Sequence, residues 1–186
     1  MAEVNYGPLA GLTGRWKGDK GEDKSPEPEG TEVNQYTETI EFSAVGDVDN
    51  AETQELAAIH YQLEVHRIRD GKSIHHQTGY WIWDAAAALV MHSFTIPRAV
   101  SVIAGGAYDG QLTAEGSVVI EVSAALDNPD WQIIQSPFMQ QNANTREFQQ
   151  QMVIAADELN YQQTMRIDIY GRLSFEHSDQ NRLQRC

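Results

Sequence analysis

Hydrophobic and polar residues alternate with a period of two along most of this chain, and almost no segment shows the spacing of a helix. The alternation is clearest in residues 35–44, 57–66 and 159–169. Successive side chains of a strand point to opposite faces of a sheet, so each segment is expected to be a half-buried strand of an antiparallel sheet. The pattern therefore predicts an all-β protein.

The same alternation predicts about ten strands joined by turns. Asp70-Gly71 lies between two alternating segments and is the clearest signal for a tight hairpin turn. Pro97 is expected to end a strand, to mark a bulge or to lie at a sheet edge. Strands are expected at residues 15–17, 32–44, 55–68, 73–83, 87–96, 100–108, 111–123, 131–134, 146–154 and 158–170.

Three segments are expected to lack strand structure. Residues 7–14 are expected to form a short helical turn that plugs one end of the sheet. Residues 19–30 are acidic and contain Pro and Gly, which is typical of a mobile surface loop, and residues 46–50 are expected to be a connection. No linker or repeat divides the chain, so residues 1–186 are expected to form one domain.

A sheet of about ten strands joined by hairpins has two edge strands with unpaired backbone groups. Closing the sheet on itself pairs these two edges with each other. The predicted architecture is therefore a single antiparallel up-and-down β-barrel. A barrel of about ten strands is wide enough to hold a ligand as well as side chains. What fills the interior is then the functional question.

Composition narrows the classes of function. The chain has 27 acidic and 13 basic residues, for a formal net charge of −14. Such a charge argues against binding to nucleic acid or to an anionic membrane surface, both of which need a basic face. The first five residues lack the basic start and apolar stretch of a secretory signal, although a processed precursor would look the same. No apolar run approaches the ~20 residues of a membrane helix, and the single cysteine is Cys186. These features predict a cytoplasmic protein, and a homodimer is plausible because symmetric dimers are common.

The common catalytic signatures are absent, which leaves the histidines as candidates for chemistry. His60 and His66 share one strand face with Gln62 and Glu64, and such a row could hold zinc with help from another strand. The opposite face of that strand is apolar, so a solvated outer face is the favoured interpretation. His92 shares its parity with apolar residues and is expected to point inward, where it would hydrogen-bond a neighbour.

Two further positions carry alternatives. His75 and His76 lie on opposite faces of one strand, and aromatic residues on both faces leave open which of them faces the barrel. His177 lies outside a regular strand pattern. A loop histidine beside a barrel mouth can reach a metal or cofactor, although its spacing alone favours an exposed residue near the chain end.

Four stretches, in order, resemble the nitrobindin-like heme-binding β-barrel family. Gly14-Arg15-Trp16-Lys17-Gly18 is similar to the Gly-x-Trp-x-Gly opening of that family, and residues 70–80 are similar to a hairpin in which a histidine precedes Thr78-Gly79-Tyr80. Residues 157–166 are similar to its penultimate strand. His177, followed by Leu183 and Arg185, falls close to its axial heme histidine.

The resemblance implies a fatty-acid-binding-protein-like barrel that holds ferric heme b near one mouth. His177 would be the axial ligand of the iron, under an apolar and open distal side. The other cofactor-binding positions implied are Gly14, Trp16, Gly18, His75 and Thr78. The resemblance also implies binding of nitric oxide and, in some members, isomerisation of peroxynitrite. An imidazole is a natural iron ligand, and the cofactor would carry the chemistry.

The chain departs from the family pattern at several positions. Lys20 stands where a third glycine is expected, and one extra residue separates Met165 from His177. Pro97 and Arg98 replace part of a small polar run, where Arg98 could offer a cation to a carboxylate such as a heme propionate. Two other functions stay open because a shared fold does not fix a shared site. One is a carrier of a fatty acid or other apolar ligand, and the other is an interaction domain with a filled interior.

Overall fold

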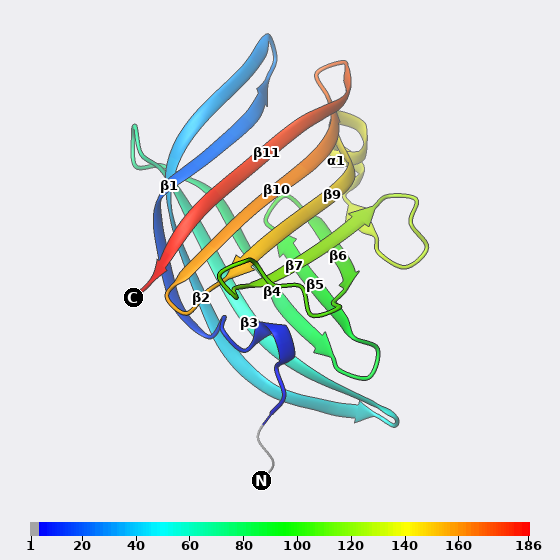
Figure 1. The fold of residues 1–186 in the computed structure, drawn as a ribbon. Coiled ribbons are helices and arrows are strands. Elements are labelled where there is room, and N and C mark those ends of the chain that lie inside the picture. Colours follow the sequence, from blue (N-terminus) through cyan, green and yellow to red (C-terminus); the bar gives the residue numbers. More distant parts are fainter. Residues whose placement is uncertain (1–3) are drawn as a thin grey trace.

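The computed structural model describes residues 4–186, which form eleven strands, one 3-10 turn and one short helix (Figure 1). The 3-10 turn η1 spans Gly7–Leu9 and the helix α1 spans Pro137–Asn142. The strands are β1 (Gly14–Glu27), β2 (Gly30–Ala51), β3 (Gln54–Arg67), β4 (Ser73–Asp84), β5 (Leu89–Ile96), β6 (Val100–Ala107), β7 (Val118–Ala125), β8 (Ile133–Gln135), β9 (Ala143–Ile154), β10 (Glu158–Ile169) and β11 (Arg172–Arg185).

The strands form one closed antiparallel barrel, which confirms the predicted fold class. The hydrogen-bonded order is β5-β4-β3-β2-β1-β11-β10-β9-β7-β6, and a β5–β6 pairing closes the ring of ten strands. Strand β8 is an addition that pairs with β6 outside the ring order. The closure is uneven, because the β6–β7 pairing has a single residue pair in register, Gly105 with Ser123.

The expected loop at residues 19–30 is instead a strand hairpin. Strand β1 continues to Glu27 and, beyond a register shift between Gly18 and Gly21, pairs with β2 again, with Asp23 opposite Asn34 and Glu27 opposite Gly30. The inner face of this hairpin carries polar side chains, so it lacks the apolar alternation that marks a strand in sequence. Residues 46–50 likewise belong to β2, beyond a register shift near Gly46.

The segment around His177 is also a strand rather than an irregular chain end. Strand β11 lies between β10 and β1, so the last strand of the chain pairs with the first. Its inner face is polar over three alternate positions, His177, Asp179 and Asn181, before the buried Leu183. A polar inner face hides the strand period from a reading based on hydrophobicity.

Smaller differences concern the region between β6 and β9. Residues 111–117 lie outside the named strands, and β7 begins at Val118. Helix α1 was not expected, because six residues are too few to show a helical period. Its start is nevertheless marked by Ser136, whose Oγ accepts a hydrogen bond from the backbone N–H of Met139. No helix of the described residues is long and apolar enough to cross a membrane.

The end of the barrel beside η1 is closed by apolar side chains. Leu9, Leu12 and Trp16 are fully buried there, and the Trp16 indole N–H donates to the backbone oxygen of Leu12 over 2.7 Å. The guanidinium of Arg185 lies 4.2 Å above the Trp16 ring. The expected plug is therefore present at this end of the barrel.

Gly79 tests how tightly the barrel wall is packed. A Cβ atom at Gly79 would lie 2.1 Å from the backbone oxygen of Ser93 on β5, whereas a Cβ atom at Gly30 would meet nothing within 4 Å. We expect Gly79→Ala to destabilise the fold by about 2 kcal/mol or more, because the neighbouring backbone must move. Gly30→Ala is the control and should stay within about 0.5 kcal/mol of the wild type. Denaturant unfolding measures both, and equal stabilities of the two variants would contradict the packing described.

Candidate functional site

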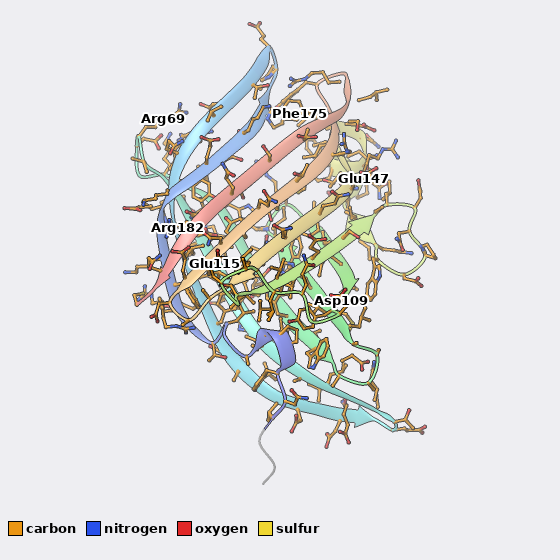
Figure 2. All side chains as sticks on the ribbon, viewed as in Figure 1. Arg69, Asp109, Glu115, Glu147, Phe175 and Arg182 are labelled. Atoms are coloured by element: carbon orange, nitrogen blue, oxygen red, sulfur yellow. The ribbon has the colours of Figure 1, made fainter. Side chains whose placement is uncertain are left out.

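His177 points into the barrel near the end opposite the plug. It shares the inner face of β11 with the buried residues Asn181 and Leu183, and it lies directly opposite Met165 on β10. Figure 2 shows Phe175 and Arg182 toward opposite ends of β11, so His177 lies near the end that carries the β10–β11 hairpin. Its side chain is 21% exposed. We call this end of the barrel the mouth.

The imidazole of His177 is held by a carboxylate from the neighbouring strand. Its Nε2 atom lies 2.7 Å from Oδ1 of Asp23 on β1. Burial raises the pKa of Asp23, but hydrogen bonds from His177, Ser25 and Asn34 outweigh it and lower the pKa below the usual value. The carboxylate is therefore ionised and fixes the ring. A histidine held in this way by a carboxylate is a common arrangement in metal sites.

His75, rather than His76, faces the barrel interior. The His75 ring donates from Nε2 to Oε1 of Gln77 over 3.2 Å, and its pKa is lowered mainly by burial and also by the nearby His177. His76 is half exposed on the outer face, where it contacts Ser73 and lies 3.8 Å from Glu64. Burial thus shows which of the two histidines faces the barrel, which the alternation along the strand left open.

Beneath the two histidines lies a buried cluster of acids and tyrosines. The Tyr161 hydroxyl lies 3.1 and 3.0 Å from the two carboxyl oxygens of Glu38, and the Asn181 amide donates to Glu38 over 2.7 Å. The Tyr36 hydroxyl contacts both Tyr161, at 2.8 Å, and a carboxyl oxygen of Asp179. The cluster thus joins β2, β10 and β11 through their inward side chains.

Burial makes both acids of this cluster hard to ionise. The pKa of Glu38 is raised to about 8 by burial and by the charge of Asp179. The pKa of Asp179 is raised to about 6, again mainly by burial. At neutral pH the pair therefore holds one negative charge, with Glu38 protonated. Like charges in a shared buried site separate the two ionisations in this way.

Deeper in the barrel, aromatic side chains fill the interior. The His92 ring stacks on Trp81 at 3.9 Å between centroids and contacts Phe94 and Phe148. A cavity of about 20 Å³ lies beside Trp81 and His92, and its lining extends to Leu63 and His75. Pockets for small molecules measure roughly 300–1,000 Å³. The expectation of an interior wide enough for a ligand is therefore wrong for the depth of the barrel, because aromatic residues occupy that space.

The mouth offers a different environment. Leu63, Ile96 and Met165 are half-buried there and pack against the core without being covered by it. Together with His75 and His177 they form what we call the mouth site, a set of imidazole and apolar side chains. This chemistry fits a flat apolar cofactor with a nitrogen-bound metal, whereas the filled depth does not. Arg98 lies in the exposed turn after β5, at the same end.

The remaining predicted site residues lie away from the mouth site. Gly14 and Trp16 are near the plug. Trp16 lies opposite Arg185, which is eight residues, or about 25 Å of strand, from His177 along β11. Gly18 lets Asn181 approach, since a Cβ there would lie 2.8 Å from the Asn181 amide. Thr78 faces outward and bonds the backbone oxygen of Tyr61 and the ring of His60.

The zinc alternative for the row His60–His66 finds no support in the geometry. His60 contacts Thr78 and the ring of Tyr80 on the outer wall. Within residues 4–186, no group of three or more His, Cys, Asp or Glu side chains could hold a metal ion. A heme iron needs fewer protein ligands, so the mouth site is unaffected by this result.

Sequence reasoning missed the acids of the site, although one of them left a signal. Glu38 occupies the same parity as Tyr36, Ile40 and Phe42, so a charged residue interrupts an apolar face. Such an interruption indicates a buried acid that needs partners. Asp23 and Asp179 left no such signal, because the residues next to each of them in the sequence are polar on both faces of the strand.

Comparison with known proteins agrees with this architecture. A family model described as "THAP4-like, heme-binding beta-barrel domain" matches residues 5–185. Among solved structures, the crystal structure of Rv2717c from M. tuberculosis is similar with a TM-score of 0.70 and 23% sequence identity, over 96% of this chain and 94% of that chain. At this identity the likeness shows the fold alone. No curated protein matches the sequence.

The raised pKa of Glu38 predicts a pH-dependent stability. The folded state keeps the Glu38 proton up to about pH 8, whereas a free glutamate loses it near 4.5, so stability falls as pH rises through this window. Glu38→Gln keeps a neutral side chain and should remove this fall. Between about pH 6 and pH 8, the wild type should lose about 2 kcal/mol more than the variant.

Denaturant unfolding at several pH values measures this difference. Glu115→Gln removes an exposed carboxylate outside the barrel interior and serves as the control. Its stability should follow that of the wild type at every pH. Parallel curves for the wild type and Glu38→Gln would show that Glu38 titrates normally.

Proposed function

Because the chain belongs to the THAP4-like, heme-binding β-barrel family, we propose that it binds heme b at the barrel mouth, with His177 as the axial ligand of the iron. The observation that carries the proposal is the inward orientation of His177, whose partly exposed ring is held by Asp23 at the end of the barrel opposite the plug. A second inward histidine, His75, lies at the same end. The plugged end offers no comparable group.

Different residues of the mouth site would bind different parts of the heme. His177 supplies a ring nitrogen, and Asp23 holds the other nitrogen and so fixes the plane of the ring. Leu63, Ile96 and Met165 supply apolar contacts for the macrocycle and limit the access of water. Arg98, in the exposed turn between β5 and β6, would offer a cation to a propionate carboxylate. The filled depth of the barrel confines the cofactor to the mouth.

The bound heme would supply the redox and small-ligand chemistry. We extend the proposal to binding of nitric oxide and isomerisation of peroxynitrite, which is supported by the sequence resemblance alone. The interior below the mouth is more polar than that resemblance implies, because Glu38, Tyr61, His92 and Gln150 line its small cavity. A polar surface of this kind can hydrogen-bond a small ligand, so it bears on which molecules the iron would hold.

Two other functions face specific observations. A fatty acid carrier needs an apolar channel, but the interior cavity measures about 20 Å³. The ionised carboxylates of Asp23 and Asp179 would also repel the carboxylate of a fatty acid that entered the barrel. An interaction domain with a filled interior is favoured by the aromatic packing around His92. A function as an interaction domain would not explain why two histidines point inward at the mouth site.

Reconstitution with hemin tests the proposal directly. We expect the purified protein to develop a Soret band at one equivalent of hemin, and His177→Ala to lose it, because the variant removes the axial nitrogen. His76→Ala removes an exposed imidazole from the outer face and is the control. It should bind as the wild type does. A full Soret band in His177→Ala, or none in the wild type, would refute the assignment.

Asp23 provides a graded test of the same site. Asp23→Asn keeps the size of the side chain but weakens its hydrogen bond to His177, so hemin affinity should fall by about 10- to 100-fold. Asp47→Asn alters an exposed carboxylate on β2 and should leave the affinity unchanged. Hemin titration followed by absorbance measures both. Equal affinity in Asp23→Asn and the wild type would show that the carboxylate does not position the ring.

A further inference from the structure

The interior next to the mouth site is too small for the proposed cofactor. The cavity that Leu63 and His75 line measures about 20 Å³, whereas pockets for small molecules measure roughly 300–1,000 Å³. A heme that binds at His177 therefore needs more space than this cavity has. Part of the wall near His177 must move, and the contacts of the strands indicate which part is held least firmly.

The tip of the β1–β2 hairpin, residues 25–33, rises beyond the neighbouring strands at the mouth (Figure 1). On one side, the pairing of β1 with β11 ends at Lys24 and Ser178. On the other side, the pairing of β2 with β3 begins at Tyr36 and Arg67. Within residues 4–186, the hairpin tip is therefore paired in the sheet only with itself, between β1 and β2.

The hairpin tip also lacks a buried apolar face. Each of its residues is exposed or only partly buried, including Val33, which is 57% exposed. A two-stranded hairpin without apolar burial is marginally stable in water. Contacts with neighbouring elements must therefore hold the tip in its position.

Two arginines hold the hairpin tip, one from each side. Arg172 at the start of β11 donates from Nη1 to the backbone oxygen of Gly30 over 2.8 Å and from Nη2 to that of Glu27 over 2.6 Å. On the other side, Nη1 of Arg69 lies 2.7 Å from a carboxyl oxygen of Glu32. The Arg69 side chain is 57% exposed, and exposed ion pairs contribute little. Hydrogen bonds from a charged donor contribute more, so Arg172 makes the stronger contact.

Arg172 also bridges a gap in the wall beside His177. Residues 25–27 of β1 and 172–177 of β11 continue their strands beyond the last pair of the two strands, and Arg172 joins them at the far end of this gap. At the near end, Asp23 is still within the β1–β11 pairing and bonds His177. Movement of the tip away from β11 would widen the gap and leave Asp23 in place against His177.

We propose that the hairpin tip is a gate to the mouth site and that Arg172 is its latch. In the closed state, Arg172 holds the tip against β11. In the open state, both hydrogen bonds of Arg172 are broken and the tip turns about the last pair of β1 with β11, which gives a flat cofactor access to His177. The purpose of the gate rests on the proposed binding of heme, whereas its opening can be measured without heme.

Electron–electron distance measurements on the protein without hemin test the latch. Spin labels are attached at Glu29→Cys on the exposed turn of the tip and at Gln141→Cys on α1, in a Cys186→Ser background that removes the exposed native thiol. We expect one main distance in the background protein. Arg172→Gln should raise the population of a longer distance by about tenfold, because hydrogen bonds from a charged donor are lost.

Hemin uptake followed by stopped-flow absorbance tests whether the gate controls access. Without the spin labels, Arg172→Gln should take up hemin about tenfold faster than the wild type, since the open state is more populated. Arg172→Lys keeps the charge but not the planar pair of donors, so its rate should lie between the two. Arg166→Gln is the control, because Arg166 pairs with Glu147 and Glu176 on the outer wall and does not touch the hairpin tip. It should behave as the wild type does.

The two measurements separate failure of the gate from failure of heme binding. An unchanged distance in Arg172→Gln would overturn the gate, whatever the result with hemin. A longer distance with an unchanged rate of hemin uptake would show that the tip moves without controlling access, and would overturn the gate as well. If the wild type takes up no hemin, the proposed function fails and the gate loses its purpose, even if the tip opens.

Discussion

The structure depends on the hydrogen bonds that Glu38 and Asp179 share with Tyr36 and Tyr161. These side chains project inward from β2, β10 and β11. Their hydrogen bonds therefore link β2, near the start of the chain, to β10 and β11 at its end. Removing a carboxyl group from water is costly unless it is paired or protonated. The cluster meets this requirement by keeping Glu38 protonated and by giving each carboxyl group a hydroxyl or amide donor. The barrel is thus polar in its middle layer and apolar at the plug.

This layering explains why the mouth and the depth of the barrel have different chemistry. Above the cluster, Asp23 and His177 form a pair that is still accessible from the mouth. Below it, the ring of His92 is packed between aromatic side chains and touches only a small cavity. His177 and His92 therefore have separate surroundings although both lie on the inner wall of the barrel, and of these two only His177 is partly exposed.

The fold was largely predictable because most strands bury one apolar face, as the alternation in residues 57–66 shows. The failures share one cause. Asp23 with Asn34, and His177 with Asp179, place polar residues on inner faces, so hydrophobicity could not reveal the end of β1 or the strand β11. His177 itself was named through resemblance, whereas its partner Asp23 could be found only in three dimensions, because 154 residues separate them.

The uneven closure of the barrel has a consequence for its motions. Nine of the ten neighbouring strand pairs share several residue pairs in register, but β6 and β7 share one, Gly105 with Ser123. Backbone groups that lack a partner across a seam are the first to meet solvent when a structure opens locally. We therefore expect the barrel wall to open locally between β6 and β7. Backbone amide hydrogens of these two strands should exchange with solvent sooner than those of β2 and β3.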